Sequence, residues 1–226
     1  MDAVERFLCL ASYETGHDFL CQCAQMGIRV TLLTLDQHRD AAWPHESLED
    51  LATMPPGLNR EQILNTVSWM ARGRRFDRVV ALCDADLETA AQIREHMRVP
   101  GMGTTTAGCY RDKLAQRVIT RAFGYRVPEF CRVLNYDELR DYVARVPAPW
   151  LLKPRTDALL AATRTLETSE QLWRTLDAMG DAQSRYILEQ FMHGEVFHVD
   201  SIISECEVKF SIVHQTGICP GQGGAG

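Results

Sequence analysis

Residues 186–200 decide the fold, and they read Y-I-L-E-Q-F-M-H-G-E-V-F-H-V-D. Their apolar and β-branched residues predict a strand over 186–191 and another over 195–203, with a turn at Gly194 between them. Glu189 then lies at the end of the first strand and Glu195 at the start of the second. A third strand over 208–213 follows without a helix, which predicts an antiparallel meander.

Two lysines upstream of this acidic segment stand at the ends of predicted elements. Lys113 opens a helix in Y-R-D-K-L, and Lys153 closes the apolar strand 150–154 in L-L-K-P-R. A lysine in such a place is either an edge residue whose stem covers apolar surface or a cation aimed into a cleft. Each alone is usually an edge residue, but the acidic segment that follows favours a cleft.

The first hundred residues alternate short apolar runs with amphipathic stretches. Alternation of this length predicts a parallel sheet covered by helices on both faces. Residues 43–59 show no such period and hold three prolines, so they are expected to form a loop with a helical turn. The predicted strands are 7–11, 28–35 and 78–82, and the predicted helices are 18–26, 60–72 and 87–97.

The later part of the chain mixes the two element types in an α+β manner. Residues 111–123 form a strongly amphipathic stretch that predicts one helix ending at Gly124. Asn135 with Glu138, and Thr168 with Gln171, are spaced as capping boxes for two more helices. Short strands are expected over 128–133, 150–154 and 163–166.

Composition and charge exclude several classes of protein. The 226 residues are 46% hydrophobic and 24% charged, as in ordinary globular proteins. No apolar run is long enough for a membrane helix, and the N-terminus is no secretory signal. A net charge of −6 without a basic stretch argues against nucleic acid as a partner. The eight cysteines are scattered, which favours buried thiols in a reducing, cytoplasmic setting.

Three further patterns have both a functional and a structural interpretation. The ending 221–226 matches G-x-G-x-x-G, but no helix follows it, so a dinucleotide role is not expected. His198 and Asp200 share a strand face with His193 nearby, yet two converging ligands do not make a metal site, so no metal ligand is assigned. Asp84 and Asp86 follow a predicted strand, where ligands bind or where turn acids simply stabilise a loop.

Taken in order, the motifs around Lys113, Lys153 and 189–200 resemble those of the ATP-grasp superfamily, in its carboxylate–amine or carboxylate–thiol ligase type. The resemblance covers about 111–213, and 7–106 is similar to the Rossmann-like domain that precedes it in that family. It implies a Rossmann-like domain over 1–107 and the first part of an ATP-grasp domain over 108–226. The small lobe would span about 108–185 and the large lobe would begin at about 186–226.

The resemblance also implies a nucleotide site that uses ATP and magnesium. Lys113 and Lys153 would be the cations that neutralise the α- and β-phosphates. His198 would be a candidate contact on the phosphate side. The apolar strand residues expected to wall the adenine slot are Leu152 and Ile187.

The adenosine half of the nucleotide would contact the acidic segment. Glu189 would accept a hydrogen bond from the adenine amino group, and the backbone around Phe191 and Met192 would form the hinge beside the ring. Glu195 would accept from the ribose hydroxyls. The implied substrates are a small carboxylate and an amine, whose identities the sequence does not specify, and neither does it specify the oligomeric state.

Two departures from the family pattern shape the expectations. Residues 155–166 contain no glycine, whereas many relatives have a glycine-rich loop there that covers the phosphates. The family's magnesium ligands, an acid and a Glu-x-Asn pair, fall in later strands, so none can be named before Gly226. We therefore expect the 226 residues to be an N-terminal portion that binds ATP without turning it over.

Two other hypotheses remain open on the sequence. A non-catalytic nucleotide-binding or interaction module would keep the adenine slot without the metal-binding lobe. A plain Rossmann-like binder of a small molecule would use its lysines only as surface residues. ATP should protect the ligase and the non-catalytic module against thermal unfolding, and it should not protect the plain binder.

Overall fold

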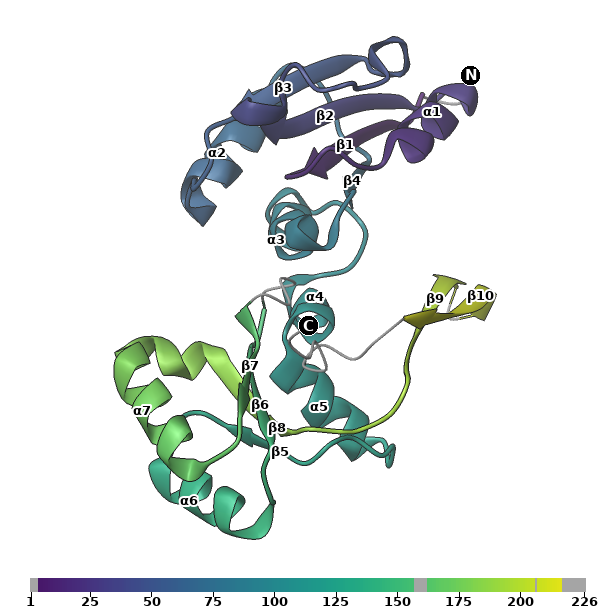
Figure 1. Cartoon of the computed structure of the whole chain (residues 1–226). Helices are drawn as coiled ribbons and strands as arrows, with labels where there is room; N and C mark the ends of the chain where they lie inside the picture. Colours follow the sequence, from purple (N-terminus) through teal and green to yellow (C-terminus); the bar gives the residue numbers. More distant parts are fainter. Residues whose placement is uncertain (1–3, 157–161, 206, 217–226) are drawn as a thin grey trace. The chain divides into compact units, whose positions relative to one another are not determined.

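The computed structural model describes residues 4–156, 162–205 and 207–216. The chain divides into two compact units, Met1–Gln116 and Arg117–Gly226 (Figure 1). Each unit has its own sheets and its own core, and each is described by itself. The expected domain boundary after residue 107 stays a prediction.

The first unit is built on a four-stranded sheet whose strands are all parallel. The strand order β3-β2-β1-β4 has β1 at its centre, paired with β2 on one side and β4 on the other. This confirms the predicted parallel sheet. The strands are β1 (Arg6–Ala11), β2 (Arg29–Leu35), β3 (Asp50–Met54) and β4 (Arg78–Ala81).

Helices cover both faces of this sheet because successive residues of β1 point to opposite sides. Leu8 and Leu10 pack with residues of α2 (Arg60–Met70) and α3 (Leu87–Met97). Cys9 packs on the other face with α1 (His17–Gln25). Short 3₁₀ turns complete the described part of this unit at Asp36–His38, His45–Ser47 and Asp84–Asp86.

The expectation of a loop with a helical turn over residues 43–59 is right only in part. The helical turn is the 3₁₀ turn His45–Ser47, but the segment also contains the strand β3, which pairs with β2. Its sequence D-L-A-T-M has little β-propensity of its own, so it is the pairing at the edge of the sheet that makes it a strand. The helix α4 (Thr104–Arg111) was not expected at all.

The helix expected over 111–123 is α5 (Lys113–Ala122), which begins two residues later than expected because the chain breaks between α4 and α5. Asp112 has extended backbone angles, and its Oδ1 accepts a hydrogen bond from the Leu114 N–H at 2.9 Å. A side-chain acceptor at this position satisfies one of the unpaired N–H groups at a helix start. Asp112 therefore ends one helix and caps the next.

The second unit has a four-stranded antiparallel sheet in the order β5-β8-β6-β7. Helices α6 and α7 cover one face of it (Figure 1), and their core includes Leu139, Leu172, Leu176 and Leu188. The strands are β5 (Phe130–Arg132), β6 (Trp150–Pro154), β7 (Arg164–Leu166) and β8 (Tyr186–Gln190), and the helices are α6 (Tyr136–Arg145) and α7 (Ser169–Met179), with a 3₁₀ turn at Gly180–Arg185.

Both helices of this unit begin at the residues the sequence indicated. The Asn135 side chain accepts from the Glu138 N–H at 3.0 Å, and Thr168 Oγ1 accepts from the Gln171 N–H at 3.2 Å. Neither capping box is reciprocal: the Glu138 carboxylate accepts from the Arg132 guanidinium, and Gln171 Oε1 accepts from the Glu167 N–H at 2.8 Å. The capping residues were thus predicted correctly and the partners of Glu138 and Gln171 were not.

The expected three-stranded meander is wrong. β8 lies between β5 and β6, whereas β9 (Val196–Ser204) and β10 (Glu207–Thr216) pair with each other in a separate two-stranded sheet. The strand propensities of all three segments are similar, so only the partners available to β8 decide its place. β8 therefore carries Glu189 into the middle of the antiparallel sheet.

The core of the second unit allows a matched stability test. Leu139 is 0% exposed in α6, whereas Leu134 is 57% exposed just before it. We expect Leu139→Ala to lower the free energy of unfolding by about 2–5 kcal/mol, because it leaves a cavity among packed side chains. Leu134→Ala should change it by less than about 0.5 kcal/mol. Urea unfolding followed by circular dichroism measures both, and equal effects would contradict the assignment of this core.

Candidate functional site

The candidate site of the second unit is centred on the buried carboxylate of Glu189, which is 1% exposed in β8. Arg117 Nε donates to Glu189 Oε1 at 2.6 Å. The Lys153 ammonium forms an ion pair with Glu189 Oε2. A buried carboxylate is stable only when it is paired and hydrogen-bonded, and here each oxygen has a cationic partner.

The register of the sheet explains why Lys153 and Glu189 meet. Lys153 lies opposite Ile187, and Leu151 lies opposite Glu189, across the β6–β8 pair. Directly opposite residues point to the same side, so these side chains share one face, here called the Glu189 face. It is the face opposite the one covered by α6 and α7, and Arg117 reaches it from α5.

A second residue of α5 also contacts the Glu189 face. The Arg121 guanidinium lies 4.3 Å from the centre of the Phe130 ring, and Phe130 is opposite Glu189 across β5 and β8. An arginine over an aromatic face is attracted by the ring quadrupole. Arg117 and Arg121, one turn apart, thus fix the C-terminal half of α5 over this face of the sheet.

One of the two expected adenine-wall residues is on the wrong face. Leu152 is fully buried in the core with Leu172 and Leu176, on the side of the sheet that the helices cover. The strand period of two requires this, because Lys153 points the other way. Ile187 does lie on the Glu189 face, and Leu151 is the β6 residue that accompanies it there.

The segment after β8 changes from buried to exposed within a few residues. The Phe191 N–H donates to the Pro149 carbonyl at 3.1 Å, and the Phe191 side chain is buried. Met192 is 54% exposed and lines an open hollow of about 560 Å³ together with Arg121, Tyr125 and Glu129. Glu195 is exposed directly before β9.

The remaining predicted phosphate residues lie elsewhere in the chain. Lys113 is the half-buried first residue of α5 and belongs to the first unit, so its predicted role stays a prediction. His198 is exposed on β9, with its Nε2 3.6 Å from Asp200 Oδ2. The expected phosphate cover falls partly on 157–161, and the G-x-G-x-x-G ending falls on 217–226, both outside the described residues.

Burial keeps two ionisable groups beside this sheet neutral. The pKa of Tyr142 is raised above its ordinary value by burial, and the negative charges of Glu129 and Glu189 add to the shift. Its hydroxyl donates to the Glu129 carbonyl at 3.0 Å. Burial likewise raises the pKa of the Cys131 thiol to about 11. Neither group supplies a charge at neutral pH.

In the first unit the structure favours a structural role for Asp86. Its buried carboxylate accepts from the Ser12 N–H at 2.7 Å and from the Cys83 thiol at 2.9 Å. It thereby ties the loop after β1 to the turn after β4. Asp84 is exposed and pairs with the Arg111 guanidinium at 2.6 Å.

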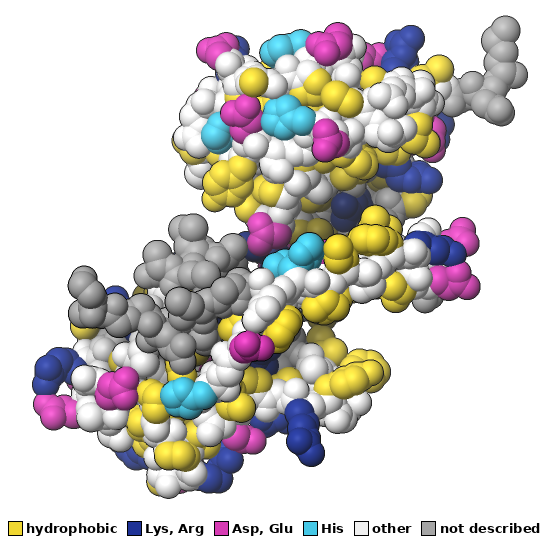
Figure 2. Space-filling view, turned by 45° about the vertical axis from the view of Figure 1, so that its right-hand side comes forward, with side chains coloured by type: hydrophobic (Ala, Val, Ile, Leu, Met, Phe, Trp, Pro, Cys, Tyr) yellow, Lys and Arg dark blue, Asp and Glu magenta, His cyan; other side chains and the backbone are white. Residues whose placement is uncertain are grey.

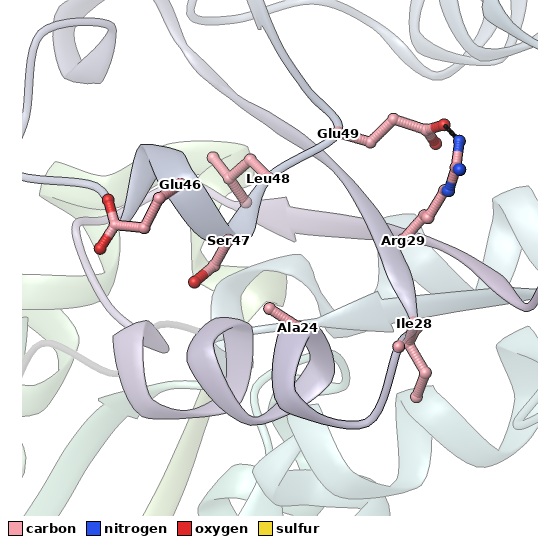
Figure 3. A pocket seen from close by; sticks show the side chains of 8 residues that line it. Ala24, Ile28, Arg29, Glu46, Ser47, Leu48 and Glu49 are labelled. Atoms are coloured by element: carbon pink, nitrogen blue, oxygen red, sulfur yellow. Dashed lines mark hydrogen bonds and ion pairs between the residues drawn. The ribbon is translucent and has the colours of Figure 1, made fainter.

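Hollows in the first unit lie at the amino ends of its strands. One of about 420 Å³ is lined by the turn Gly27–Ile28 before β2 and by Ser47 and Leu48 before β3 (Figure 3). At its edge Arg29 and Glu49 form an ion pair at 3.0 Å. Open parallel sheets bind ligands at the carboxyl ends of their strands, so this hollow is not where a ligand is expected.

Arg117 is the site residue that the sequence analysis missed. It lies four residues after Lys113, one turn further along the same helix. A charged residue on an amphipathic helix is usually solvated, and nothing local distinguishes Arg117 from Arg121. Only the position of α5 over β8 shows that its partner is a buried carboxylate.

No protein-family profile matches the chain. An L-arginine-specific L-amino acid ligase of Bacillus subtilis is 24% identical over 141 residues, which are 60% of this chain and 34% of that protein. No helix in the described part of the chain is long and apolar enough to cross a membrane.

The solved structures give a closer match in fold. An L-amino acid ligase from Bacillus licheniformis superposes with a TM-score of 0.74 at 18% identity, covering 95% of this chain and 50% of that one. A carboxyaminoimidazole ribonucleotide synthase from Aspergillus clavatus, complexed with ATP, gives a TM-score of 0.70 at 16% identity over 96% and 55%. These proteins are ATP-grasp ligases, and the chain has the ATP-grasp fold over about half of their length.

The cluster formed by Glu189, Arg117 and Lys153 predicts a measurable loss of stability when one of its two cations is removed. Arg117→Ala should lower the free energy of unfolding by about 1–3 kcal/mol, because one oxygen of the buried Glu189 carboxylate loses its partner. Arg174→Ala is the matched control, since Arg174 pairs with Glu170 where both side chains are exposed. Its effect should be about 0.5 kcal/mol or less. Urea denaturation compares the two, and an Arg117 effect no larger than the control would contradict the cluster.

Proposed function

We propose that this chain binds ATP with the adenine ring beside Glu189, as part of a ligase that joins a carboxylate to an amine. The observation that carries the proposal is a buried carboxylate on a sheet face, held by two cations, directly before a segment that becomes exposed. The ATP-grasp fold supports the same assignment.

The chemistry of Glu189 fits an adenine amino group. An ionised carboxylate has about four acceptor positions, and Arg117 and Lys153 use only some of them. Because Glu189 is 1% exposed, a further N–H donor reaches the remaining position only when a side chain over the Glu189 face, such as Lys153, moves aside. Because the carboxylate is already ordered, binding costs little side-chain entropy.

The rest of the nucleotide would extend from Glu189 along both positively and negatively charged side chains. Lys153 supplies positive charge for the phosphates, and Glu195 supplies an acceptor for the ribose hydroxyls. The phosphate role of Lys113, which belongs to the first unit, stays a prediction. His198 is the further candidate on the phosphate side. Magnesium bound with ATP would neutralise charge between the β- and γ-phosphates, and no described residue is assigned as its ligand.

The substrate class proposed for the ligase is L-amino acids. One relative in sequence and one in fold are, by their names, ligases of L-amino acids. In this reaction the carboxylate of one substrate is activated as an acyl-phosphate, with release of ADP. The amine of the other then displaces phosphate to form the amide bond.

Dipeptide formation separates the ligase from a non-catalytic nucleotide-binding module. The protein that contains this sequence is incubated with ATP, magnesium and pairs of L-amino acids, and products are identified by mass spectrometry. An ATP-dependent dipeptide supports the ligase. Tight ATP binding without any product from any amino acid pair favours the module.

Selectivity for the purine base tests the role of Glu189. Guanine presents a carbonyl where adenine presents an amino group, so two acceptors would face each other without a proton. An unpaired buried acceptor costs about 1–3 kcal/mol, so GTP should bind at least about fivefold more weakly than ATP. Isothermal titration calorimetry on the 226-residue chain measures both, and equal affinities would exclude this role.

The phosphate role of Lys153 predicts a different response to ATP and to adenosine. Lys153→Ala should weaken ATP binding by at least about tenfold more than adenosine binding, because a charge-assisted contact to phosphate is worth about 1.5–3 kcal/mol. Arg117→Ala is the control, since it disturbs the same carboxylate and should weaken both ligands by a similar factor. If Lys153→Ala also weakens both alike, Lys153 only positions Glu189.

A further inference from the structure

Three potential metal ligands converge on one face of the β9–β10 hairpin. His198 and Asp200 are two apart on β9, so they share a face, and His214 is directly opposite His198 on β10. The ligand atoms of all three lie within 4.8 Å of one another. Asp200 Oδ2 is 3.6 Å from the Nε2 atom of each histidine.

These distances are close to what a bound ion requires. Zn²⁺ binds histidine nitrogen and carboxylate oxygen at about 2.0–2.2 Å, so tetrahedral ligand atoms are about 3.3–3.5 Å apart. Both histidine–Asp200 separations are already near that value. The two rings stack with centroids 5.0 Å apart and 22° between their planes, so closure requires them to tilt toward each other. All three side chains are exposed, so packing does not oppose this tilt.

The donor set indicates the class of ion. Two imidazoles and one carboxylate suit Zn²⁺, Ni²⁺ or Co²⁺, whereas Mg²⁺ prefers an all-oxygen octahedral shell. Three protein ligands leave at least one coordination position for water. A simple ion pair between Asp200 and His198 would account for the position of Asp200. It would not account for His214, which lies directly opposite His198 on the neighbouring strand.

We infer that His198, Asp200 and His214 form a binding site for a divalent transition-metal ion such as Zn²⁺. The ion would connect β9 to β10, because its ligands come from both strands. Hydrophobic side chains such as Val199, Ile202 and Phe210 are exposed on this hairpin (Figure 2), so cross-strand pairing has little packing to support it within the described residues. A metal bridge would therefore stabilise the pairing of the two strands. Because His198 is also the candidate contact on the phosphate side of the proposed ATP site, zinc is titrated in the absence of nucleotide.

Calorimetric titration of the 226-residue chain with ZnCl₂, in a buffer that keeps thiols reduced, tests the site. We expect saturable binding with a dissociation constant in the micromolar range or tighter. MgCl₂ at the same concentrations should give no saturable heat at this site. His214→Ala and Asp200→Asn should each weaken zinc binding at least about tenfold.

Gln215→Ala is the matched control, because Gln215 is exposed beside His214 but points to the opposite face. It should bind zinc as the unchanged chain does. Hydrogen–deuterium exchange gives a second readout: zinc should slow exchange over 196–216 in the unchanged chain and in Gln215→Ala, but not in His214→Ala. Zinc affinity that is unaffected by His214→Ala, or the absence of saturable zinc binding, would overturn the inference.

Discussion

The second unit depends on one constraint, the burial of a charged carboxylate in the middle of a sheet. Glu189 is on β8, which lies between β5 and β6, and its carboxylate has almost no contact with solvent. A carboxylate in such a place must be neutralised and hydrogen-bonded, or the strand could not remain there. Lys153 comes from the neighbouring strand and Arg117 from α5, so satisfying one charge fixes a strand, its neighbour and a helix relative to one another.

Much of this architecture was predictable from the sequence because local patterns and tertiary packing agree. The continuous apolar run of 7–11 is typical of a strand buried on both faces, and Leu8 and Cys9 do pack into two different cores. Asn135 and Thr168 cap helices as their spacing indicates. Glu189 and Lys153 were assigned to one site by the resemblance of their motifs to those of ATP-grasp ligases, and the structure places the two side chains in contact.

The failures share a physical cause, which is that a partner distant in the sequence decides the outcome. β3 is a strand only because β2 offers it an edge, and β8 leaves the expected meander because β5 and β6 are available to it. Arg117 is chemically identical to other helix-surface arginines until α5 is placed over β8. The error at Leu152 is of another kind, because the strand period already placed it on the face opposite Lys153.

The segment that follows Glu189 combines two different physical environments within a few residues. The side chains of Glu189 and Phe191 are buried, and the Phe191 N–H donates to the Pro149 carbonyl. The geometry of these two residues is therefore fixed before any ligand binds. From Met192 to His198 nearly every side chain is exposed. Ordered groups give selectivity because they cannot adjust to a wrong partner, whereas exposed groups can move to meet a charged and hydrated one. A ligand bound along this segment would be selected at its buried end and accommodated at its exposed end, which suits a molecule with a flat, neutral base and a charged, flexible tail.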